Sequence, residues 1–189
     1  ELHVPQWRLR PRTRKPRTDL VVFDLDPGPP AAIGECCEVA LALRELLSAD
    51  GLEPVAKTSG SKGMQVSAPV SVVDPEMPSR YARALAEQLE AERSDLIVSR
   101  MTKSLRPGKV LVDWSQNNPA KTTVAPYSLR AREEPTVSTP VSWGEVASGE
   151  VLRFTATEVL DRVQADGDLF AGALEDATRS RVTPSMATR

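Results

Sequence analysis

The chain has 189 residues, a formal net charge of −2 and 40% hydrophobic residues, which suits a single domain with a buried core. No segment approaches the roughly 18 uninterrupted apolar residues of a membrane span, and the first residues lack the features of a signal peptide. The adjacent Cys36 and Cys37 cannot form a zinc site alone. We interpret them as small hydrophobic residues on a helix in a reducing cytoplasm.

Charge is distributed unevenly along the chain. Residues 8–17 carry six basic side chains and no acid, and residues 100–132 carry seven against Asp113 alone. Residues 133–176 carry ten acids against two arginines. This asymmetry indicates one surface that faces a polyanion and one end that faces solvent, although a solvated loop also explains residues 8–17.

The first predicted elements are a strand, a helix and two further strands. Residues 20–23 form an apolar run that Pro27 and the turn residues after it end. Apolar residues recur at helical spacing over 32–50 and stop before Gly51. Strands follow near 54–59 and 64–69, separated by a glycine-rich turn.

The second half continues the alternation. An amphipathic pattern predicts a helix over 79–93, and short strands are expected at 96–99 and 110–113, paired across the turn at 106–108. Another short strand is expected at 122–126.

The C-terminal third is predicted to be helical and then irregular. Thr155 and Glu158 form a capping box that opens a helix. A short helix is expected at 169–177, and the polar tail, 178–189, is expected to be disordered or a linker. The sequence therefore predicts an α+β (mixed α/β) domain over 1–177, with a mainly antiparallel or mixed sheet flanked by helices.

Asp24 and Asp26 follow the first apolar strand and share one face of it, because side chains alternate along a strand. Two carboxylates so close repel each other unless a cation lies between them. A pair of divalent metals would resolve that repulsion and create a phosphoryl-transfer centre. Two solvent-facing aspartates at a strand end are the alternative.

The loop Thr58–Gly63 (TSGSKG) combines two glycines, hydroxyls and Lys62. The glycines allow a tight turn whose N–H groups could face a phosphate, but the spacing is not that of a Walker A loop. A plain hairpin turn explains the composition equally well.

A third acid, Asp113, ends the apolar run Val110–Val112 and precedes Trp114. It could supply the third carboxylate of a two-metal site, or it could simply cap a strand. Lys121 and Arg130 follow in a basic stretch and could neutralise a triphosphate.

The order of these motifs resembles one known family. Its strings are matched by ELHVPQW (1–7), VFDLDPG (22–28), TSGSKG (58–63), MTKSLR (101–106), VDWSQN (112–117) and KTTVAPYSLR (121–130). The chain is similar, from residue 1 to about 170, to the polymerase domain of bacterial DNA ligase D, a branch of the archaeo-eukaryotic primase superfamily.

The resemblance implies a role for each matching position. It implies that Asp24, Asp26 and Asp113 are catalytic residues that bind two divalent metal ions, Mn²⁺ or Mg²⁺. It also implies nucleotide-binding roles for several other side chains, namely His3, Ser59, Lys62, Gln116, Lys121 and Arg130.

The family's activity is nucleotidyl transfer to DNA 3′ ends in non-homologous end joining. Its partners are DNA ends with gaps or overhangs, nucleoside triphosphates (ribonucleotides preferred), the Ku protein and a ligase domain. The resemblance implies the same for this chain, in a bacterial cytoplasm at the nucleoid and without a membrane.

Two departures from the family pattern stand out. Gln65 occupies a position where the family usually has histidine, and glutamine cannot take up a proton and a charge. The family also carries sequence before the ELHVP string, including lysines for a DNA 5′-phosphate. We therefore expect this chain to be an N-terminally truncated form of the domain.

Two other functions remain open. A catalytically weak DNA- or Ku-binding module of the same fold would fit the Gln65 change. A haloacid-dehalogenase-type phosphatase would also place D-x-D after a strand, with the first aspartate as nucleophile. That class usually continues with Gly-Thr, whereas Pro27 and Gly28 follow here.

Overall fold

A computed structural model describes residues 1–8, 17–72, 74–150, 153–175, 180–183 and 186. Most of the basic run at 8–17 lies outside these residues. The strands are β1 (His3–Val4), β2 (Trp7–Arg8), β3 (Arg17–Thr18), β4 (Leu20–Pro27), β5 (Val55–Thr58), β6 (Met64–Ser71), β7 (Ile97–Val98), β8 (Val110–Asp113), β9 (Thr123–Val124), β10 (Leu129–Arg130), β11 (Thr136–Val137), β12 (Pro140–Val141) and β13 (Ser180–Arg181). The helices are α1 (Ile33–Ala49), α2 (Met77–Glu92), α3 (Trp143–Ser148) and α4 (Ala156–Asp166), with 3₁₀ turns η1 (Lys103–Leu105), η2 (Trp114–Asn117) and η3 (Ala171–Leu174).

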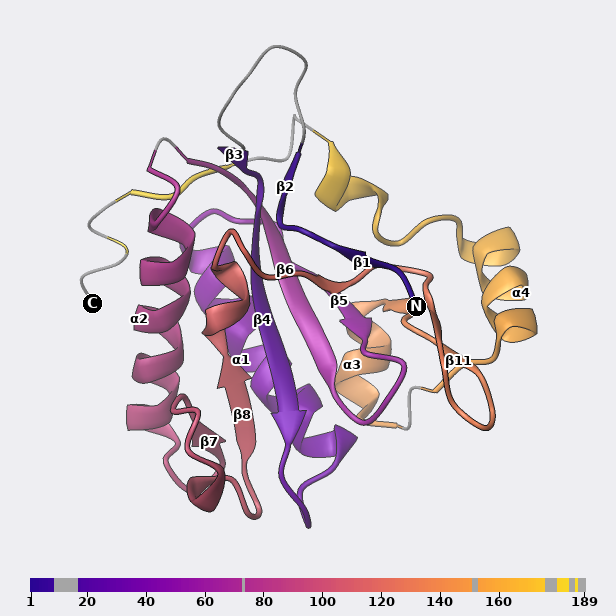
Figure 1. Cartoon of the computed structure of the whole chain (residues 1–189), viewed down its shortest axis with the longest axis horizontal. Coiled ribbons are helices and arrows are strands. Elements are labelled where there is room, and N and C mark those ends of the chain that lie inside the picture. The colour runs from indigo at the N-terminus through magenta and orange to yellow at the C-terminus, as the bar shows by residue number, and fades with distance from the viewer. Residues whose placement is uncertain (9–16, 73, 151–152, 176–179, 184–185, 187–189) are drawn as a thin grey trace.

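A mixed sheet forms the centre of the molecule, with β4 and β6 as its long inner strands (Figure 1). The strand order is β12-β5-β6-β4-β8-β7, and β13 pairs with β6. The pairs from β12 to β8 are antiparallel, whereas β7 with β8 and β13 with β6 are parallel. This arrangement confirms the predicted mixed α/β fold class.

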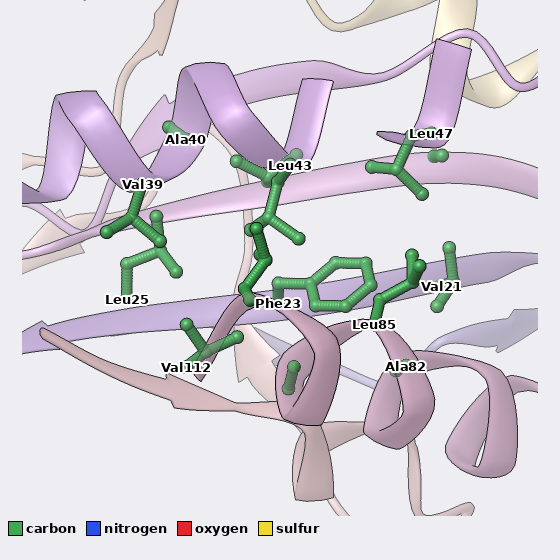
Figure 2. Packing of buried hydrophobic residues seen from close by; sticks show 14 of the residues in the cluster. Val21, Phe23, Leu25, Val39, Ala40, Leu43, Leu47, Ala82, Leu85 and Val112 are labelled. Atoms are coloured by element: carbon green, nitrogen blue, oxygen red, sulfur yellow. The ribbon is translucent and has the colours of Figure 1, made fainter. Parts of the chain in front are cut away.

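Alternation along β4 separates an apolar face from a polar one. Val21, Phe23 and Leu25 are completely buried and face the helices. In Figure 2, Phe23 lies between the side chains of Leu43 on α1 and Leu85 on α2. The intervening aspartates therefore project from the opposite face of the sheet.

Most predicted elements form close to their expected bounds. The capping box at the start of α4 is present, with the Thr155 hydroxyl accepting from the Glu158 N–H. Cys36 and Cys37 are buried and unbridged, as expected. Among the described residues, no helix is long and apolar enough to cross a bilayer.

Three local predictions differ from the structure. The strands near 96–99 and 110–113 do pair, but as parallel β7 and β8, so the segment between them is a crossover containing η1 and not a hairpin. The short helix expected at 169–177 is present as the shorter 3₁₀ helix η3, and residues 176 and 177 lie outside the described residues. Within the predicted disordered tail, β13 pairs with β6 and Val182 is buried. The rest of that tail, apart from Thr183 and Met186, lies outside the described residues.

Candidate active site on the polar face of the sheet

A row of polar side chains crosses the sheet on the face opposite α1 and α2. Lys57 of β5 pairs with Gln65 of β6, Gln65 pairs with Asp24 of β4, and Asp24 pairs with Asp113 of β8. Residues directly opposite each other on neighbouring strands project from the same face. Antiparallel pairing therefore brings two carboxylates together from positions 24 and 113.

The row is largely buried. Lys57, Gln65 and Asp113 are 2%, 4% and 8% exposed, and Asp24 is half-buried. The Gln65 amide donates from Nε2 to Asp24 Oδ1 at 3.0 Å. Burial, helped by the negative charge of Asp26, raises the pKa of Asp24 from 3.8 to about 7. Ionising Asp24 in the folded protein therefore costs free energy, and a bound cation would reduce that cost.

The third carboxylate, Asp113, accepts hydrogen bonds from the residues that follow it in the chain. Asp113 Oδ1 accepts from the Ser115 N–H at 2.8 Å and from the Ser115 hydroxyl at 2.5 Å, and Oδ2 accepts from Gln116 Nε2 at 3.0 Å. Within the described part of the chain, no three acidic, histidine or cysteine side chains are grouped as ready metal ligands. The residue types fit a divalent metal, since these three hydrogen bonds leave a lone pair of Asp113 Oδ2 available.

A buried asparagine fixes this loop to the sheet. Asn117 is 1% exposed, and its side chain accepts from the Val22 N–H at 2.8 Å and donates to the Val22 carbonyl at 2.7 Å. The amide thus continues the ladder of β4 where β8 has ended. Sequence reasoning missed this residue, although its place in the VDWSQN string was visible.

A cavity of about 230 Å³ opens above the aspartates. Most of the predicted site residues line it: His3, Asp24, Asp26, Ser59, Lys62, Gln116 and Arg130. Asp113, which pairs with Asp24, and Lys121, which contacts the Ser115 hydroxyl, are not lining residues. The structure therefore gathers seven of the nine predicted positions around one concave site, with these two close to it.

The loop Thr58–Gly63 is held together by hydrogen bonds to the hydroxyl of its own Ser59. Ser59 Oγ accepts from the N–H groups of Ser61 and Gly63, each at 3.2 Å. Two N–H groups that the sequence suggested for a phosphate are therefore already bonded. Gly63 is required by a close approach, since a Cβ there would lie 2.1 Å from the Leu25 carbonyl oxygen. Lys62 remains as the loop's cation at the cavity wall.

His3 and Arg130 also line the cavity, and Glu1 lies close to both. The Glu1 carboxylate lies 3.4 Å from His3 Nε2 and 3.4 Å from Arg130 Nε. It also accepts from the Ala131 N–H at 3.1 Å, which is the main reason that the pKa of Glu1 is lowered. His3 reaches the site because β1 pairs with β9, so that His3 lies opposite Val124.

These features define a primase-polymerase domain. The family model described as "LigD, primase-polymerase domain" matches residues 1–170, and the chain belongs to this family.

Known relatives bear out the assignment. The multifunctional non-homologous end joining protein LigD of Mycolicibacterium smegmatis is 47% identical over 178 residues, which are 94% of this chain and 23% of that protein. The corresponding DNA repair protein of Mycobacterium tuberculosis is 45% identical over 187 residues, covering 94% of this chain and 24% of the protein. The chain thus spans about a quarter of the length of these relatives.

A solved structure supports the fold. It is described as the polymerase domain from Mycobacterium tuberculosis ligase D in complex with DNA, and it superposes with a TM-score of 0.84 at 44% identity. The match covers 89% of this chain and 61% of the other.

Proposed function

We propose that this chain carries the catalytic centre of a nucleotidyltransferase that adds nucleotides, ribonucleotides in preference, to DNA 3′ ends during non-homologous end joining. The observation that carries the proposal is the pairing of Asp24 with Asp113 across β4 and β8, with Asp26 two residues further along the same face. Asp24 and Asp26 line a cavity that His3 and Lys62 also line.

Asp24, Asp26 and Asp113 would hold two divalent cations, Mn²⁺ or Mg²⁺. Cations at such a site activate a hydroxyl nucleophile and neutralise a triphosphate. Gln65 orients the Asp24 carboxylate through its 3.0 Å hydrogen bond. Asp113 would coordinate through Oδ2, which accepts one hydrogen bond, from Gln116, and keeps a second lone pair for a metal ion.

The remaining cavity residues suit the nucleotide. Lys62 and Ser59 would bind the triphosphate from one wall, while Arg130 and His3 would bind it from the other, after the Arg130 guanidinium exchanges Glu1 for phosphate. Gln116 and Lys121, beside Asp113, would complete the nucleotide site. DNA ends, Ku and a ligase domain are the proposed partners, in the cytoplasm at the nucleoid.

Template-directed primer extension tests the proposal. The 189-residue chain and a form extended at its N-terminus are supplied with Mn²⁺ and with ribo- or deoxynucleoside triphosphates. Asp24→Asn and Asp113→Asn should abolish extension, whereas Asp161→Asn, on the exposed side of α4, should not. Normal extension by either site variant would refute the assignment.

A non-catalytic DNA-binding module of the same fold is the second candidate. The observation in its favour is that Ser115 and Gln116 occupy both oxygens of Asp113. Binding of gapped DNA without extension by either form of the chain, in any divalent metal, would support this candidate.

A further inference from the structure

Lys57 is a buried cation beneath the candidate site. It is 2% exposed, and its Nζ donates to the Ser138 hydroxyl at 2.7 Å. In the described part of the chain it forms no ion pair. Its place in the polar row puts it two strands from Asp24, roughly 10 Å away in the backbone at about 4.8 Å per strand.

Two charged side chains of the site, Asp24 and Arg130, act on the Lys57 ammonium. Burial lowers the pKa of the Lys57 ammonium from 10.5 to about 7, while attraction to Asp24 opposes that fall and the Arg130 guanidinium adds to it. A lysine used only to fill space would be replaced at lower cost by an apolar residue of similar length. The charge that Lys57 carries below about pH 7 therefore calls for an electrostatic explanation.

Gln65 lies between Lys57 and Asp24 in the polar row, and its side chain carries no charge. Its Nε2 donates to Asp24, and among the described residues its buried Oε1 has no hydrogen-bond partner. The positive charge of Lys57, one strand further on, lowers the pKa of Asp24 and so opposes the effect of burial.

We propose that Lys57 sets the charge balance of the site: it weakens binding of divalent cations while the nucleotide is absent, and strengthens binding of the nucleoside triphosphate once they are present. This inference rests on the proposed function. A protonated Lys57 in the same row as the carboxylates repels a divalent cation and attracts a triphosphate. Coulomb's law at about 10 Å and an effective dielectric constant of about 20 makes each effect more than tenfold before screening.

The test compares the 189-residue chain with Lys57→Met, which keeps the length of the side chain and removes its charge. Mn²⁺ binding without nucleotide and ATP binding at saturating Mn²⁺ are measured by calorimetry from pH 6 to pH 8, and each Mn²⁺ affinity is corrected for the proton displaced from Asp24, whose pKa is about 7. The variants are compared at the acid end of this range, below the lysine's pKa, where most of Lys57 carries its charge. Lys103→Met, on the exposed turn η1, serves as the matched control. Lys57→Gln carries the same prediction if the methionine variant does not fold.

Opposite shifts are expected. Lys57→Met should bind Mn²⁺ at least fivefold more tightly and ATP at least fivefold more weakly, with Lys103→Met unchanged in both. Lys57 variants that leave both affinities unchanged, or move them in the same direction, would overturn the inference while the proposed function stands. If the wild-type chain bound neither Mn²⁺ nor ATP, the proposed function itself would fail, and the inference with it.

Discussion

Replacing Asp24 by asparagine should stabilise the metal-free protein while removing a proposed metal ligand. Asparagine keeps the oxygen that accepts from Gln65 Nε2, but it cannot ionise. The charged form of Asp24 is disfavoured by burial and by Asp26, which together raise its pKa from 3.8 to about 7. Ionisation of Asp24 therefore destabilises the folded wild-type protein, whereas the asparagine variant has no such destabilisation.

The size and pH range of that cost follow from proton linkage. Between about pH 4 and pH 7 the folded protein binds more protons at Asp24 than the unfolded chain does, so stability falls as the pH rises. At about 1.4 kcal/mol per pKa unit, the full rise corresponds to about 4 kcal/mol. Because Asp24 keeps partial contact with solvent, we expect about half of this, near 2 kcal/mol, above pH 7.

Urea denaturation in EDTA from pH 4 to pH 8.5 measures the effect. The free energies of unfolding of Asp24→Asn and wild type should coincide near pH 4 and diverge in favour of the variant above pH 7. Asp161→Asn, an exposed change on α4, controls for the loss of one negative charge. The reasoning is refuted if Asp24→Asn is no more stable than wild type at pH 8.

Three further changes test the structural basis of the site. Asn117→Ala should destabilise the protein by about 2–4 kcal/mol in urea denaturation, because the buried N–H and carbonyl of Val22 would both lose their partner; a loss below about 1 kcal/mol would argue against the clamp. Gly63→Ala should be strongly destabilising in thermal melts, since its Cβ would meet a backbone oxygen at 2.1 Å, whereas Gly172→Ala has open space and should differ little from wild type. Cys36 should resist a thiol reagent until denaturant is added, because burial raises the pKa of its thiol; rapid modification of Cys36 in the native protein would contradict its placement.

Short-range patterns predicted much of this molecule from sequence. Helical spacing gave α1 and α2, the capping box gave α4, and alternation placed Asp24 and Asp26 on one face of β4. These features depend on residues close together in the chain. The motifs of the resemblance placed the other members of the site in one region before any topology was known.

The features that sequence reasoning missed depend on contacts between distant segments. Lys57 reads as an ordinary strand residue until strand order places it in a row with Gln65 and Asp24. The parallel pairing of β7 with β8 is equally invisible locally, because a turn at 106–108 is consistent with either direction. The role of Asn117 depends on where β8 ends. Because β8 stops at Asp113, the backbone of Val22 on the neighbouring strand β4 is left for the Asn117 amide to pair with.

The antiparallel register of β4 with β8 determines both the packing of the core and the positions of the site aspartates. Side chains alternate along a strand, so a slip of one residue would turn Asp24 and Asp26 into the apolar layer and bring Phe23 and Leu25 out to water. A chain misaligned in this way loses its core and its acids at once. Selection for a well-packed interior therefore also preserves the alignment of the carboxylates, without any separate mechanism to check it.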